Sequence, residues 1–143
     1  MRMLFLVLVL AACRAPAPKP EEKANWSGQM QGMAADVKKL VPYLYDRQAF
    51  ADPKNREKIS QTLKEFSQAA HKVNPESGRN FIGDELLLEY SLANLRDEIG
   101  RAAQSFAAGQ LDYSRSVAKT SLSNCFRCHS VTNAGSSAAW DLD

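Results

Sequence analysis

The chain has 143 residues, which is enough for one compact domain and too few for two domains of ordinary size. Its hydrophobic content of 45% suits a globular core, and 18 Lys and Arg residues against 16 Asp and Glu residues leave a net charge of only +2. This balanced surface gives no electrostatic reason to expect nucleic acid as a partner.

The first twelve residues have the pattern of an export signal. A single positive charge, on Arg2, precedes the wholly apolar run Leu4–Leu10. That run is much shorter than the ~20 apolar residues that a membrane-spanning helix needs, and it fits the core of a secretory signal. We therefore expect residues 1–12 to be a signal peptide that is removed from the mature protein.

The residues at the end of this signal, Leu10-Ala11-Ala12-Cys13, resemble a bacterial lipobox. The resemblance implies that Cys13 carries a diacylglycerol thioether and becomes the first residue of the mature protein. The alternative is an ordinary signal with an unrelated cysteine beside it. Three prolines follow within Arg14–Lys23, so residues 13–24 are predicted to be a lipidated cysteine with an extended tether on the order of 30 Å. We expect an exported protein that a lipid anchors to the membrane on its periplasmic side.

From Asn25 onward, apolar residues recur every three or four positions in four segments, the pattern of amphipathic helices. The first two segments carry Trp26, Met30, Met33, Val37, Leu40 and Leu44, and then Ile59, Leu63, Phe66, Ala70 and Val73. Pro42 is expected to kink the first helix. Asp52 and Pro53 predict a helix cap and a first-turn proline in the break at residues 50–55.

The third and fourth segments complete the predicted domain, residues 25–131. The third carries Phe81, Leu88, Leu92, Leu95, Ile99 and Phe106 and stops at Gly109, and the fourth starts near Asp112, a candidate N-cap. No run of strict alternation is long enough for a strand. The pattern predicts an all-α fold, an antiparallel four-helix bundle, with an irregular helical globule as the alternative. Residues 132–143 form a C-terminal tail.

The motif Cys125-Phe126-Arg127-Cys128-His129 is the most specific feature of the sequence. Two cysteines three apart on a helix place their thiols on one side, where they can add across the two vinyl groups of a haem. The histidine that follows can bind the iron. This pattern predicts one covalent haem c, with thioethers at Cys125 and Cys128 and His129 as an axial ligand.

Two other interpretations of the cysteine pair are weaker. A zinc site wants four ligands, and His71 would have to join the motif without a second pair of ligands to support it. A thioredoxin-like redox pair should open a helix after a strand, whereas this pair closes a helix in a chain without predicted strands.

Four helices with a CxxCH motif near the C-terminus resemble the class II c-type cytochromes, the cytochrome c′ family and its methionine-ligated relatives. The resemblance covers about residues 25–131. It implies a haem between the end of the last helix and the start of the first, with its far face covered by a residue early in the first helix. The matching positions are Met30, which is preferred, and Met33. His71, at the end of the second helix, and an iron without a sixth protein ligand remain alternatives.

The predicted function is electron transfer by a six-coordinate iron with histidine and methionine ligands. The alternative is a five-coordinate haem protein that binds or scavenges NO or CO. No catalytic dyad or phosphate-binding loop argues for an enzyme.

Expected partners are redox proteins of the respiratory chain or periplasm and the membrane, with a homodimer left open. Arg115, Lys119 and Arg127, on the haem-bearing helix, are expected to frame an exposed edge for an acidic partner.

Overall fold

The computed structural model describes residues 20–78 and 85–131, and every regular element in these ranges is a helix. The elements are α1 (Pro20–Tyr45), α2 (Arg47–Ala51), the 3-10 turn η1 (Pro53–Asn55), α3 (Arg56–Lys72), α4 (Pro75–Gly78), α5 (Glu85–Ala107) and α6 (Leu111–Val131). The predicted all-α class is confirmed. The predicted signal peptide, Cys13, Phe81 and the tail at residues 132–143 lie outside the described residues.

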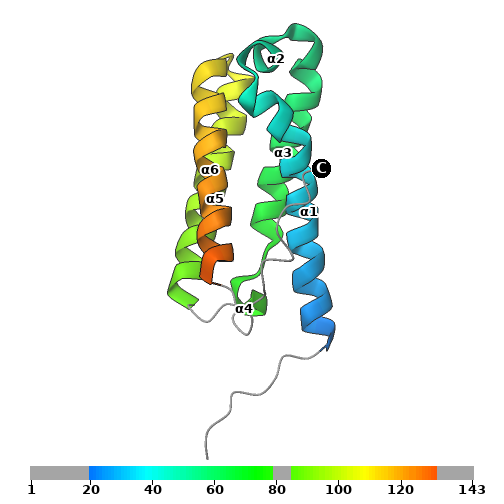
Figure 1. Ribbon diagram of the computed structural model, residues 1–143, viewed down its shortest axis with the longest axis vertical. Coiled ribbons are helices and arrows are strands. Elements are labelled where there is room, and N and C mark those ends of the chain that lie inside the picture. Colours follow the sequence, from blue (N-terminus) through cyan, green and yellow to red (C-terminus); the bar gives the residue numbers. More distant parts are fainter. Residues whose placement is uncertain (1–19, 79–84, 132–143) are drawn as a thin grey trace, which may run out of the picture.

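The four long helices α1, α3, α5 and α6 lie side by side along the long axis of the molecule (Figure 1). The short helix α2 lies at one end of this array, and α4 lies at the other. α6 finishes at the same end at which α1 begins. α6 packs extensively against α5 and only sparsely against α1. α1 and α6 are therefore the most loosely packed pair of neighbouring long helices. No helix in the described ranges has both the length and the apolar character required to cross a membrane.

Most of the apolar residues that the helical spacing predicted lie in the core, and Trp26 and Met30 are half-buried at its edge. Its fully buried members include Leu40, Leu44, Ile59, Leu63, Phe66, Leu88, Ile99 and Phe106. Full burial of one such side chain contributes about 1.5–3 kcal/mol. Phe50 was expected in a break, but it lies in α2, and its ring meets that of Phe106 edge to face at a centroid distance of 5.3 Å. α2 thus closes the upper end of the core in Figure 1.

Three helix boundaries differ from the expectation. α1 begins at Pro20 and not at Asn25, because a proline is tolerated in the first turn, where its missing N–H has no helical partner. α1 contains Pro42 in its interior, as expected, but ends at Tyr45, before the break expected at residues 50–55. Asp112 lies inside the first turn of α6 and accepts hydrogen bonds from Arg47 at 2.6 and 2.8 Å. The predicted cap at Asp52 is confirmed, since its carboxylate accepts from the Lys54 N–H at 2.9 Å.

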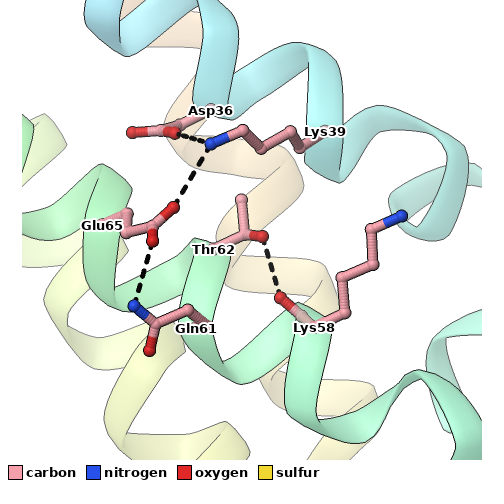
Figure 2. A network of polar contacts seen from close by, with 6 residues as sticks. All are labelled: Asp36, Lys39, Lys58, Gln61, Thr62 and Glu65. Atoms are coloured by element: carbon pink, nitrogen blue, oxygen red, sulfur yellow. Dashed lines mark hydrogen bonds and ion pairs between the residues drawn. The ribbon is translucent and has the colours of Figure 1, made fainter.

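A polar network joins α1 to α3 beside the core (Figure 2). The Lys39 Nζ lies 2.9 Å from the Asp36 carboxylate and 3.2 Å from that of Glu65, which in turn accepts from Gln61. Asp36 is only 7% exposed, so the lysine supplies a counter-charge to a nearly buried carboxylate. The same hydrogen bonds raise the pKa of Lys39.

Two arginines occupy the carbonyl-rich ends of helices, which lack partners within their own helix. Arg115 of α6 donates to the Leu44 carbonyl, near the end of α1, at 2.7 Å. Arg96 of α5 donates to the carbonyls of Ala70 and Val73, at the end of α3, at 3.0 and 2.6 Å. These bonds fix the helix ends against their neighbours across the bundle.

Candidate functional site

The CxxCH motif occupies the last turns of α6, at the end of the molecule where α1 begins (Figure 1). Cys125 and Cys128 are both half-buried, and both pack against the hydrophobic core. Residues three apart in a helix are neighbours on one face, so the two thiols lie one above the other on the inward side of α6. Neither forms a disulfide. The structure therefore places the two sulfurs together, as the spacing predicts.

The surroundings keep both sulfurs protonated at neutral pH. Burial raises the pKa of Cys125 from 9.0 to about 12, and the neighbouring Cys128 adds to the rise. Burial also raises the pKa of Cys128, against which the Ser91 hydroxyl and the positive charge of Arg127 act in the opposite direction. Metals bind cysteine as the thiolate, which this environment disfavours. Within the described ranges, no group of three or more His, Cys, Asp or Glu side chains is placed to hold a metal ion.

His129 and Phe126 are exposed on the side of α6 that faces α1. Two residues earlier in α6 show which side of the helix this is. Arg115 donates to the Leu44 carbonyl of α1, and the Lys119 Nζ lies 4.8 Å from the centre of the Tyr45 ring, also in α1. His129 is fourteen residues after Arg115, and Phe126 is seven after Lys119, so each nearly repeats the orientation of the earlier residue. Phe126, at 60% exposure, presents a large apolar surface there.

The structure separates the two candidate methionines. Met33 is 8% exposed and belongs to the hydrophobic core. Met30 is only half-buried and packs at the edge of that core. Met30 lies fourteen residues before Leu44, as His129 lies fourteen residues after Arg115. Because both helices rise about 1.5 Å per residue, the two positions lie equally far, about 21 Å, from the Leu44–Arg115 hydrogen bond toward the same end.

His71, the third candidate, is exposed on the last turn of α3. Its Nδ1 lies 2.8 Å from the Ser67 carbonyl oxygen of the same helix, so this nitrogen carries a proton and donates. The hydrogen bond holds the ring against α3 and leaves Nε2 as its one available ligand atom.

Sequence reasoning missed two residues of α5 that meet the motif. The guanidinium carbon of Arg127 lies 5.7 Å from the centre of the Tyr90 ring. Ser91 is 1% exposed and lies close enough to Cys128 to lower the pKa of its thiol, although the hydroxyl oxygen has no partner in hydrogen-bonding geometry among the described residues. The available signal for Ser91 was a polar residue among the inward positions Leu88, Leu92 and Leu95, but the sequence does not say which helix it faces.

Of the three basic residues expected to frame an exposed edge, the structure brings only Arg127 into the motif, and the frame itself stays a prediction. Arg115 and Lys119 contact Leu44 and Tyr45, the last two residues of α1. The reason is length, since ten residues of helix between Arg115 and Cys125 span about 15 Å. Only Arg127, within the motif, lies at the site.

Cys125, Cys128 and His129 are the residues that would hold a covalently bound haem, and a paired thiol set beside a histidine is the donor chemistry such a group requires. Comparison of the chain with protein-family models, with curated proteins and with solved structures found no match.

Proposed function

We propose that the protein is an exported monohaem c-type cytochrome that transfers electrons and is not an enzyme. The observation that carries the proposal is the placement of Cys125, Cys128 and His129 on the final turns of α6, with the thiols inward and the imidazole at the loosely packed α1 side. In this proposal each thiol adds across one haem vinyl group, the sulfur to one carbon and the hydrogen to the other. The addition needs no oxidant, and protonated thiols supply both atoms.

The proposed scaffold is an antiparallel four-helix bundle with the haem near the C-terminus of α6. Contacts between α1 and α3 support opposite chain directions. Lys39 of α1 bonds Glu65 of α3. One turn later on α1, Tyr43 lies 5.5 Å from the Nζ of Lys58, which precedes Glu65 on α3. Contacts between α5 and α6 follow the same rule, with Ser114 on Ala102 and Asn124 on Glu98.

Met30 is the proposed sixth ligand of the iron. Met30 is only partly buried, and it lies at the same height along the bundle as His129. Both observations favour it over Met33, whose side chain is buried in the core. A thioether is a soft neutral ligand that favours ferrous iron. The bound haem supplies a one-electron couple. With His129 and Met30 as its two protein ligands, a bound haem would change oxidation state without gaining or losing a ligand, so little would have to rearrange.

A second function is favoured by one specific observation. The α1-facing side of α6 at the motif is exposed, with His129 and Phe126 on it. If Met30 stays at the edge of the core when haem is bound, the iron keeps an open distal position, and the protein binds NO or CO.

The proposed location is the periplasmic side of a membrane, with Cys13 lipidated. This part of the proposal rests on the lipobox-like residues 10–13 alone. An anchor would keep a carrier close to membrane-bound redox partners and raise its effective concentration there.

The test is expression of the full chain in a bacterial host that carries out cytochrome c maturation. The expected product has the mass of the processed chain plus one haem and a reduced spectrum that carbon monoxide does not change. A Soret band that shifts with carbon monoxide would select the gas-binding alternative. A colourless protein with the mass of the bare polypeptide would contradict both. Replacement of Cys125 and Cys128 by alanine is the matched control and should abolish attachment.

A further inference from the structure

The buried hydroxyl of Ser91 stands out among the hydroxyl groups of the helices. Ser114, Ser121, Thr62 and Thr120 all donate to backbone carbonyls, at 2.7 to 3.1 Å. Ser91 is as deeply buried as the first two, at 1% exposure, yet its oxygen has no partner in the described part of the chain. An unsatisfied buried hydroxyl is costly, so its presence calls for a partner.

The register of α5 against α6 identifies what Ser91 faces. Ser114 of α6 donates to the Ala102 carbonyl of α5. Counting eleven residues back along α5 and eleven forward along α6 from this pair brings Ser91 level with Cys125. Asn124 of α6 donates to the Glu98 carboxylate of α5. Counting seven residues back along α5 and seven forward along α6 from this pair brings Ser91 level with Val131. Cys128 lies between these two limits.

The orientation of Ser91 on α5 agrees with this register. Ser91 is seven residues before Glu98 and eleven before Ala102, so all three lie on one stripe of the helix. Two members of the stripe bond α6 directly. The third, Ser91, therefore also faces α6, but closer to the C-terminus of that helix, at the half-buried sulfur of Cys128.

We infer that Ser91 is a positioning residue for the second haem attachment point, and that its hydroxyl donates a hydrogen bond to the Cys128 sulfur once that sulfur is a thioether. The inference rests on the proposed function. A thiol supplies its own proton and a rotating S–H, whereas a thioether sulfur is an acceptor only and its position is fixed by two carbon bonds. Attachment thus gives the orphan hydroxyl a fixed acceptor and ties the haem edge to α5 as well as to α6.

The hydroxyl also provides a dipole beside the macrocycle. Its positive end points toward the sulfur, so it stabilises the form of the haem that carries more electron density, and it raises the reduction potential. Cys125 has no counterpart to Ser91 among the hydrogen bonds of the described residues. The two attachment points are therefore unequal.

The experiment compares Ser91→Ala and Ser91→Thr with a matched control, Ser114→Ala, which removes an equally buried hydroxyl far from the motif. The full chain is matured with haem, and its midpoint potential is measured by spectroelectrochemical titration. Ser91→Ala is expected to lower the potential, Ser91→Thr to restore most of it, and Ser114→Ala to leave it unchanged. Urea unfolding is measured in parallel on haem-containing protein and on haem-free protein from a host without maturation.

The effect of Ser91→Ala on the urea midpoint should differ between haem-free and haem-containing protein. In haem-free protein, Ser91→Ala should leave the urea midpoint unchanged or raise it, because no hydrogen bond is lost. In haem-containing protein it should lower the midpoint, whereas Ser114→Ala should lower it in both forms.

Three results would overturn the inference. They are an unchanged potential in Ser91→Ala, a lowered urea midpoint already in its haem-free form, and loss of haem from both Ser91 variants. Loss of haem from the alanine variant alone would support the positioning role. Wild-type protein without haem would instead contradict the proposed function itself, so the two failures are distinguishable.

Discussion

Arg127, between the two cysteines of the motif, lies over the ring of Tyr90 on α5, with its guanidinium carbon 5.7 Å from the ring centre. The contact joins the motif to the neighbouring helix from the solvent side, opposite the inward thiols. Tyr90 is 59% exposed, so the pair is worth only about 0.5–1 kcal/mol.

Replacement of Tyr90 tests this contact. Tyr90→Ala should lower the free energy of unfolding by about 0.5–1 kcal/mol, because the arginine loses the ring face. Tyr90→Phe should retain most of the stability, since the ring remains. Urea titration followed by circular dichroism measures both. An equal loss in the two variants would show that the hydroxyl, and not the ring, matters. Tyr45→Ala, which removes the ring beneath Lys119, is a control at the opposite end.

The methionine assignment predicts a specific spectral change. Met30→Ala in haem-containing protein should lower the reduction potential and let carbon monoxide shift the Soret band, because the soft sixth ligand is removed. Met33→Ala should cost about 2–5 kcal/mol of stability through a cavity in the core, without opening the iron to carbon monoxide. Gas reactivity in the Met33 variant, or its appearance only in His71→Ala, would transfer the ligand role to that residue.

Gly78 permits the close packing of α4 against the start of α1. A Cβ atom at this position would collide with the Trp26 indole and would lie 2.9 Å from the Leu88 Cδ2. Gly78→Ala should therefore lower the free energy of unfolding by roughly 1–3 kcal/mol and change the near-ultraviolet signal of Trp26. Gly100→Ala is the matched control, because a Cβ there meets nothing within 4 Å. As a helix-interior glycine, it should gain about 0.5–1 kcal/mol instead. Destabilisation of both would point to a general intolerance of alanine.

The raised pKa of Cys125 predicts how the haem-free protein responds to alkaline pH. A folded-state pKa of about 12, above the usual 9.0, means that the native state holds the thiol proton more tightly than the unfolded chain. This contribution is complete below pH 9 and is lost as the pH rises toward 12. Its upper limit is about 4 kcal/mol, at 1.36 kcal/mol for each pKa unit.

Urea unfolding of haem-free protein at several pH values between 8 and 11 measures the effect. Cys125→Ala should flatten the decline, because it removes the titrating group and leaves the tyrosines and lysines in place. A slope that is identical in the two proteins would contradict the burial of this thiol. In haem-containing protein a thioether has no proton to lose, so the same flattening is expected there.

The sequence by itself predicted the helical class and most of the core. Periodicity is a local property, and burial of a stripe such as Leu88, Leu92 and Leu95 follows from it whatever the partner helix is. The cap at Asp52 and the shared face of Cys125 and Cys128 are equally local, since they depend on neighbours within one or two turns. Haem, the iron ligands, the lipid at Cys13 and electron transfer remain predictions.

Only the tertiary structure decided which residues of different helices meet. It separated the core residue Met33 from the half-buried Met30, placed Arg115 and Lys119 against the end of α1, and brought Ser91 and Tyr90 to the motif. The sequence contains no signal for these relations, because helix spacing specifies a face and not its neighbour. Register between helices depends on long-range contacts such as Arg115 on Leu44 and Ser114 on Ala102, which form when the whole set of apolar stripes packs together.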